Sequence, residues 1–196
     1  MARTSPAPDP DDARRRRLLD VALATFLRFG FRKTSMEEVA RAAGLSRQGL
    51  YLHFATKDDL FGAVVRHGLA TGLDAANAEL RNHDATLEAR LLGAFDAWVG
   101  RFVGMLGGDV ADVEEAIAQY GPLIAEHEEH FVDAVARALR ASPVAAAYKP
   151  VGISARQLAD TLAATARGLK HSCRTQPEFR ERMAIALRAL CMPVRQ

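Results

Sequence analysis

Four consecutive residues in the first third of the chain, Ser46, Arg47, Gln48 and Gly49, carry groups suited to reading DNA bases. An arginine can bond a guanine through two hydrogen bonds, and a glutamine can bond an adenine in the same way. Gly49 lets the backbone approach a groove closely, although a glycine within a helix costs about 1 kcal/mol in helix propensity. These four residues, the tetrad, are therefore predicted to contact base edges of double-stranded DNA.

Two short helices joined by a tight turn are expected to position the tetrad. Residues 35–38 read Ser-Met-Glu-Glu and form a capping box that starts the first helix. Gly44 permits the reversal between the helices. Ser46 caps the second helix, which is predicted to end near Phe54. Residues 56–59 read Thr-Lys-Asp-Asp and form a second capping box, which is predicted to open the next helix. Apolar residues anchor the rest of this second helix, so its first turn stays exposed, an order typical of a helix that enters the major groove.

Residues 13–61 resemble the TetR family of one-component regulators. The landmarks at the family's spacing are Phe26 and Gly30, Thr34-Ser35, Val39-Ala40, Ala43-Gly44-Leu45-Ser46, Leu50-Tyr51, His53-Phe54, and Lys57 with Leu60. The resemblance implies contacts with DNA phosphates at Thr34, Ser35, Tyr51, His53 and Lys57. Thr34 and Ser35 precede a helix N-terminus, where backbone amides attract phosphate.

The charge distribution favours the same interpretation. Residues 13–61 contain ten Lys and Arg side chains against five acidic ones, whereas residues 62–196 contain 15 basic and 16 acidic side chains. A basic N-terminal unit on a nearly neutral body is the pattern expected of a DNA-binding head. The cluster Arg14–Arg17 has two interpretations: a solvated helix start, or a further contact with phosphates.

Helical periodicity dominates the sequence, which is 49% hydrophobic and shows no sustained alternation of β-branched residues. The prediction is an all-α protein of about nine helices. It comprises a disordered tail (1–12), a three-helix DNA-binding domain (13–61) and a helical-bundle ligand-binding and dimerisation domain (62–196). The expected helices cover 12–30, 35–44, 46–54, 56–80, 85–106, a segment from 109 interrupted at 121–122, 123–140, 154–174 and 177–190, with a loop at 143–153.

The resemblance also implies a ligand cavity in the C-terminal domain. The candidate walls are large apolar residues of the middle helices: Phe95, Trp98, Phe102, Tyr120 and Phe131. Ordinary core packing explains the same residues. No Lys or Arg occurs between Phe102 and Ala136, where several acids stand; they would suit a cationic ligand if they faced a cavity, and otherwise form a solvated face.

The last two helices have apolar faces that the resemblance assigns to a homodimer interface. The candidates are Leu158, Leu162, Ala166, Leu169, Phe179, Met183 and Leu187. A two-fold dimer would read two half-sites of a palindromic operator, about 34–36 Å apart. The alternative is that both helices cover the core of their own subunit.

Several site classes are not expected. Cys173 and Cys191 stand far from any metal-like spacing, which favours a reducing cytoplasm and packed free thiols over a disulfide scaffold. The segment 126–130 (Glu-His-Glu-Glu-His) is not a zinc-binding HExxH motif, so neither a metal nor a cofactor is predicted. No apolar run approaches the length of a membrane span.

The prediction is a homodimeric, ligand-responsive transcriptional repressor that a small-molecule effector releases from DNA. The first alternative is an activator, or a repressor without an effector, on the same fold. A helical enzyme would need convergent nucleophile, base or metal residues, and the sequence offers no such constellation. A helical protein-interaction module would show no salt-dependent binding to duplex DNA.

Overall fold

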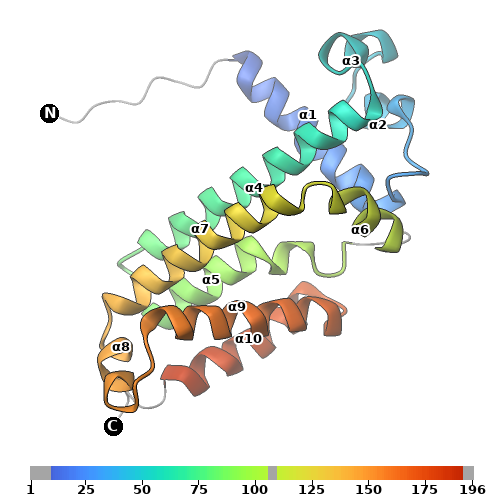
Figure 1. Ribbon diagram of the computed structural model, residues 1–196. Helices are drawn as coiled ribbons and strands as arrows, with labels where there is room; N and C mark the ends of the chain where they lie inside the picture. Colours follow the sequence, from blue (N-terminus) through green and yellow to red (C-terminus); the bar gives the residue numbers. More distant parts are fainter. Residues whose placement is uncertain (1–9, 106–109, 192–196) are drawn as a thin grey trace, which may run out of the picture. The chain divides into compact units, whose positions relative to one another are not determined.

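The computed structural model describes residues 10–105 and 110–191, and within these ranges the regular structure is entirely helical (Figure 1). The predicted all-α class is confirmed. The chain divides into two compact units, one of Met1–Gly68 with Gly107–Tyr120 and the other of Leu69–Leu106 with Gly121–Gln196. Each unit has its own apolar core.

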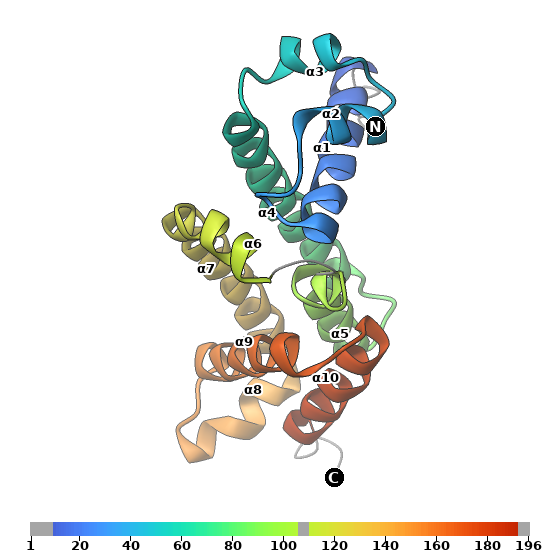
Figure 2. The same ribbon diagram turned by 90° about the vertical axis from the view of Figure 1, so that its right-hand side faces the viewer.

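The first unit holds the predicted helix-turn-helix. Its helices are α1 (Pro10–Phe29), α2 (Met36–Ala42), α3 (Arg47–His53), the start of α4 (Lys57–Arg81) and α6 (Val110–Ala118). Figure 2 shows α2 beside α1, with α3 following α2 after a short turn. Gly44 in that turn has a φ of +68°, a conformation that glycine adopts without steric cost.

Both predicted capping boxes of this unit are present. The hydroxyl of Ser35 accepts the Glu38 amide at 3.2 Å, and the Glu38 carboxylate accepts the Ser35 amide at 2.7 Å. Thr56 and Asp59 exchange the same two bonds at the start of α4, at 3.0 and 3.1 Å. These side chains satisfy amides that a helix leaves without partners in its first turn. The local sequence therefore fixes where α2 and α4 begin.

An aromatic core anchors these helices. The ring of Phe26 meets the ring of Phe61 edge-on at 5.1 Å, and Phe31 lies 4.8 Å from Phe61. Leu50 is completely buried and Phe54 is 5% exposed, so the end of α3 is fixed in this core. The opposite end of α3 carries the tetrad and stays accessible.

Helix α6 packs on the same core, which the sequence did not predict. Tyr120 follows α6 and its ring lies 6.1 Å from that of Phe61. Asp112 is 7% exposed and accepts the Arg32 amide at 2.8 Å, while Glu115 pairs with the Arg32 guanidinium at 2.6 Å. A Cβ on Gly30, whose φ is +87°, would stand 2.7 Å from the Asp112 carboxylate. The first unit is thus larger than the predicted segment 13–61.

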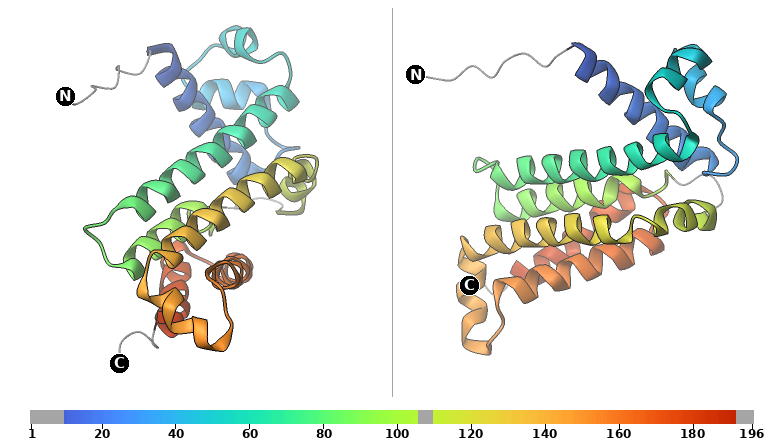
Figure 3. Two further views of the ribbon diagram at one scale, coloured as in Figure 1. Left: turned by 60° about the vertical axis from the view of Figure 1, so that its left-hand side comes forward. Right: turned by 45° about the horizontal axis from the view of Figure 1, so that its top comes forward.

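The second unit is a bundle around a separate core. It contains the rest of α4, α5 (Leu87–Trp98), η1 (Gly100–Phe102), α7 (Gly121–Arg140), α8 (Pro143–Tyr148), η2 (Lys149–Val151), α9 (Ala155–Ser172) and α10 (Gln176–Cys191). Helix α7 runs beside α9, with α8 at the end that joins them (Figure 3). Helix α10 packs against α5 and α9. Leu91, Phe95, Leu139 and Phe179 are completely buried at the centre.

Two predicted features of this unit were wrong in detail, and a third is shifted. The helix expected over 85–106 ends at Trp98 and continues as a short 3₁₀ turn. The predicted break before the helix over 123–140 is present, but it lies at 119–120, so that Gly121 and Pro122 open α7. The segment 143–153, expected to be a loop, begins with α8 and η2. In both of the last two cases a proline stands in the first turn of a helix, where its missing N–H is not needed.

Candidate nucleic-acid interface

The tetrad stands at the N-terminal end of α3. Ser46 is the N-cap residue, and its hydroxyl accepts the Gly49 amide at 3.0 Å. Arg47 and Gln48 are exposed. A Cβ on Gly49 would lie 3.1 Å from the Ser46 hydroxyl oxygen, a tight contact. The glycine therefore also gives the capping hydroxyl room, a role that sequence reasoning did not assign to it.

Arg47 is held by two neighbours. Its Nη1 lies 2.5 Å from Oε1 of Glu37 on α2, and its Cζ lies 5.7 Å from the ring centroid of Tyr51. A hydrogen bond with the Tyr51 side chain, followed by the charge of Glu37, raises the pKa of Arg47. The Arg47 guanidinium is positively charged in any case, and its two contacts favour one orientation of the side chain. Sequence reasoning missed Glu37, which stood beside the capping residue Glu38 without a role of its own.

Three residues of the predicted phosphate set are accessible. Tyr51 is 42% exposed, and Ser35 and His53 are also exposed. The carboxylate of Glu38, however, accepts both the amide and the hydroxyl of Ser35, at 2.7 and 3.0 Å. These bonds lower the pKa of Glu38 and keep it anionic. A phosphate that approached Ser35 would therefore compete with a carboxylate at the start of α2.

Thr34 and Lys57 are engaged inside the unit. Thr34 is 1% exposed and its hydroxyl donates to the carbonyl of Gly30 at 2.6 Å. This burial disfavours a phosphate contact through the Thr34 side chain, because its hydroxyl closes the loop after α1, and a contact at Thr34 stays a prediction. The Lys57 ammonium donates to the carbonyls of Phe31 and Arg32 at 3.0 and 3.4 Å. Lys57 therefore ties down the same loop.

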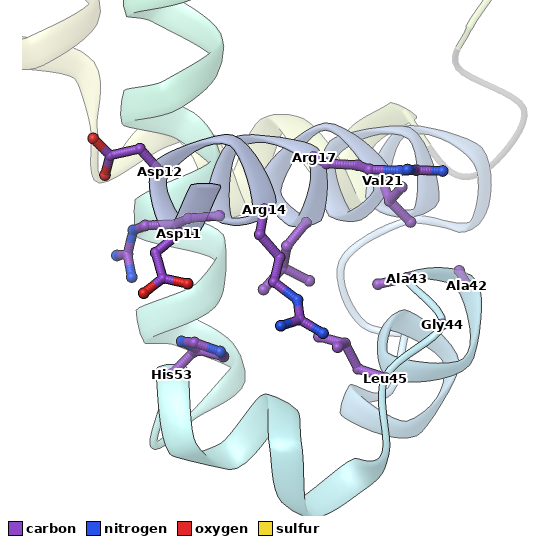
Figure 4. Close-up of a pocket in the computed structure, with 12 residues that line it drawn as sticks. Asp11, Asp12, Arg14, Arg17, Val21, Ala42, Ala43, Gly44, Leu45 and His53 are labelled. Atoms are coloured by element: carbon purple, nitrogen blue, oxygen red, sulfur yellow. The ribbon is translucent and has the colours of Figure 1, made fainter. Parts of the chain in front are cut away.

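A groove lies beside the helix-turn-helix, and both charged and apolar residues line it (Figure 4). Its volume is about 690 Å³, and it runs between the start of α1, the turn between α2 and α3, and His53 at the end of α3. Figure 4 shows Arg14 extending from α1 toward Leu45. The Arg15 guanidinium lies 5.2 Å from the Phe54 ring centroid. Arg17 also lines the groove, as do Asp11 and Asp12, which offset part of its charge.

The predicted ligand-pocket residues separate into three groups. Phe95 and Trp98 both pack on Phe131, with ring centroids at 5.1 and 5.3 Å. Phe102 instead contacts the guanidinium of Arg101 at 4.4 Å. Tyr120 belongs to the first unit. The structure therefore brings three of the five residues together, where their rings pack on one another, and an effector pocket beside them stays a prediction.

The predicted dimer residues lie in the core of their own unit. Leu158, Leu162, Ala166, Phe179, Met183 and Leu187 are at most 5% exposed, and Leu169 packs against the same core. This burial matches the alternative in which α9 and α10 cover their own subunit. The outward faces of the two helices carry other residues, among them Thr161, Ala164, Gly168 and Ile185.

Many acids of the 109–133 segment are engaged in ion pairs. Arg156 on α9 binds Glu129 and Asp133 of α7, at 2.7 and 3.0 Å. This contact lowers the pKa of Glu129. Glu128 pairs with Arg167, and Asp112 and Glu115 pair with Arg32 as described above. These ion pairs disfavour a lining for a cationic ligand, while the buried Asp112 does not belong to the predicted solvated face either. Asp109 lies outside the described residues.

In residues 10–105 and 110–191, no group of three or more His, Cys, Asp or Glu is placed to hold a metal. His127 bonds the carbonyl of Leu123 at 2.9 Å. Cys173 is buried as a free thiol, and the side chain of Cys191 is not described. No helix of the described ranges is both long and apolar enough to cross a membrane.

The N-terminal part of the chain is similar in sequence to known transcriptional regulators. Residues 18–64 match the family described as "Bacterial regulatory proteins, tetR family". The chain is 36% identical over 96 residues to the HTH-type transcriptional repressor KstR2 of Rhodococcus jostii, covering 43% of each chain. It is also 36% identical over 90 residues to the HTH-type transcriptional activator FasR of Mycolicibacterium smegmatis, covering 44% of this chain and 41% of FasR. The chain thus matches less than half the length of these curated relatives.

Likeness in structure extends over nearly the whole chain. A transcriptional regulator from Mesorhizobium loti, described as a member of the TetR family, superposes with a TM-score of 0.63 at 19% identity. The match covers 94% of this chain and 98% of the other. At that identity the comparison establishes the fold of both units.

Proposed function

Because this chain belongs to the TetR family of bacterial regulatory proteins, we propose that it is a DNA-binding transcriptional regulator whose helix α3 enters the major groove. The observation that carries the proposal is the contrast between the two ends of α3, one buried and the other exposed. Leu50 and the C-cap Phe54 are fixed in a core, while Arg47 and Gln48 are exposed at the start. Such a helix can offer hydrogen-bonding groups to base edges without losing its anchorage.

Contacts with phosphates would come from both sides of α3. Tyr51 and His53 are exposed on α3 itself, and Arg14 projects from α1 into the adjoining groove. Three arginines of the cluster, Arg14, Arg15 and Arg17, line this groove, and their position beside the reading helix favours the phosphate-contact interpretation over a merely solvated helix start. Lys57 would act mainly by holding the loop that carries Ser35.

The regulator would act as a homodimer on a palindromic operator. A single helix-turn-helix buries little surface on DNA, and a two-fold dimer doubles that surface and fixes the spacing of the two half-sites. Because the apolar faces of α9 and α10 are already buried, a partner would meet their outward faces. Sedimentation or light scattering of the full chain tests the dimer; a monomer at concentrations that bind DNA would refute it.

The finer proposal is a repressor released by a small-molecule effector that binds in the second unit. An effector shifts a regulator only by its difference in affinity for the DNA-competent and the DNA-incompetent states. One relative is a repressor and another an activator, so an activator or an effector-independent repressor is the second candidate. If a thermal-shift screen finds no stabilising compound, the effector-independent form is favoured.

The other protein classes find less support. The relatives and the structural neighbour described above are transcriptional regulators, which disfavours a helical enzyme. A protein-interaction module would leave the exposed Arg47 and Gln48 unexplained.

Selection of bound sequences from random duplex DNA tests the proposal as a whole. The full chain should enrich one palindromic sequence, and its affinity for that duplex should fall steeply with salt, by about 0.9 logarithmic units per decade for each phosphate contacted. Recovery of no common sequence, together with weak binding that is independent of salt, would contradict the proposed function.

A further inference from the structure

The arginine proposed to read a base is held by an acidic side chain from the preceding helix. Arg47 Nη1 lies 2.5 Å from Glu37 Oε1, and the Tyr51 ring, one helical turn later, supports the guanidinium. The Arg47 and Glu37 side chains are 64% and 57% exposed. The pair therefore stands on the surface proposed to face DNA.

An acid on such a surface requires an explanation, because DNA is a polyanion. Helix capping explains Glu38, whose carboxylate accepts the Ser35 amide. Glu37 stands in the same first turn, where the helix dipole stabilises an acid by about 0.3–1 kcal/mol, but the dipole does not explain why Glu37 contacts Arg47. Stability does not explain Glu37 either, since an exposed ion pair contributes only about 0–1 kcal/mol. Arg41 stands one turn along α2, yet Glu37 pairs with Arg47 across the turn between the helices. The ion pair with Arg47 indicates that the position of Glu37 is related to the tetrad.

We infer that Glu37 determines specificity: it holds Arg47 so that a neutral base edge can bind the guanidinium, while an anionic phosphate is repelled. This inference rests on the proposed DNA binding. An arginine has five N–H donors, so the bond to one carboxylate oxygen leaves donors for a further partner. Guanine O6 and N7 are uncharged acceptors, whereas every phosphate oxygen that reached the same donors would approach the Glu37 carboxylate.

The Glu37 charge would therefore affect binding to random DNA and binding to the operator differently. Without the Glu37 charge, Arg47 would bind phosphates of any sequence, and phosphate contacts carry no sequence information. Two like charges about 6 Å apart at a protein surface repel each other enough to change an equilibrium by roughly 3- to 10-fold. Glu37 is thus expected to lower affinity for random DNA more than affinity for the operator.

The test compares Glu37→Gln with Glu38→Gln in the full chain. Both changes remove one negative charge from adjacent positions of α2, and glutamine at position 38 can still form the capping box. Each variant is titrated, over a range of salt concentrations, with two probes of equal length: the duplex recovered by selection and a random-sequence duplex. Glu37→Ala serves as a second neutral variant, and far-UV circular dichroism verifies that all variants fold.

Relative to Glu38→Gln, the Glu37→Gln variant should bind the random duplex about 5-fold more tightly, with a salt slope steeper by about 0.9. Its affinity for the selected duplex should change by less than about 2-fold, so the specificity ratio falls. In an Arg47→Ala background the effect of Glu37→Gln should disappear, because the two residues act as one unit.

Two results would overturn the inference while the proposed function stands. One is an equal change in both glutamine variants on both duplexes, which would indicate only a general charge effect. The other is persistence of the Glu37→Gln effect in the Arg47→Ala background. If the wild-type chain itself showed no salt-dependent binding to either duplex, the proposed function would fail, and the inference would fall with it.

Discussion

Replacing Asp112 by alanine should loosen the attachment of α6 to the rest of the first unit. The Asp112 carboxylate is 7% exposed, accepts the Arg32 amide at 2.8 Å and lies 3.4 Å from Arg32 Nε. A hydrogen bond to a charged group contributes about 1.5–3 kcal/mol. The Arg32 side chain is 67% exposed, so the ion pair adds less than about 1 kcal/mol. The expected loss in local stability is therefore about 2–3 kcal/mol.

Glu115→Ala is the matched control for this prediction. Glu115 pairs with the same guanidinium at 2.6 Å, but its side chain is 69% exposed, so its loss should cost less than about 1 kcal/mol. Fluorescence of Trp98 reports on the second unit, so the assay is hydrogen exchange of the α6 amides. Asp112→Ala should accelerate that exchange by about 30-fold or more, and Glu115→Ala by less than about 5-fold. Equal acceleration in the two variants would refute the reasoning that the buried carboxylate holds α6.

Three further predictions concern single side chains. Thr34→Val, which removes a buried hydroxyl donor, should lower the free energy of unfolding by about 1 kcal/mol in urea titrations and leave the salt slope of DNA binding unchanged. A flatter slope would restore the phosphate contact to this residue. Phe131→Ala should lower the free energy of unfolding of the second unit by about 3–5 kcal/mol, measured by the fluorescence of Trp98. A loss below about 1 kcal/mol would contradict the position of Phe131 in a packed core. The pKa of Glu129 is lowered chiefly by its hydrogen bond from Arg156, so the stabilisation by this pair is present above the ordinary carboxyl pKa and is lost as pH falls through the lowered value. Glu129→Gln should accordingly flatten the acid side of a stability–pH curve, and an unchanged acid side would count against the pair.

Local signals in the sequence predicted the helix-turn-helix well. The capping boxes at Ser35 and Thr56 each depend on residues three positions apart, and both were found as expected. The turn at Gly44 likewise depends on one residue whose conformation glycine favours. Interactions of this range can be recognised without knowing the fold, because the chain itself brings the partners together.

Interactions between distant segments could not be predicted in the same way. Arg32 and Asp112 are eighty positions apart, and nothing in either local sequence indicates their contact. Lys57 was assigned to DNA by its position in a motif, but two loop carbonyls bind its ammonium. The apolar faces of α9 and α10 had two interpretations, and only the packed structure shows that a subunit's own core buries them. Periodicity reveals which face is buried, and it cannot reveal what covers that face.

The most direct test of the central claim is a comparison of the base preferences of the wild-type chain and Arg47→Ala, each determined by selection from the same random duplex pool. If the first turn of α3 reads bases, Arg47→Ala should lose preference at one position of each half-site, by about 1–3 kcal/mol, and keep the preferences elsewhere. An Arg47→Ala variant that recovered the wild-type sequence with every preference intact would contradict the assignment of α3 as the reading helix.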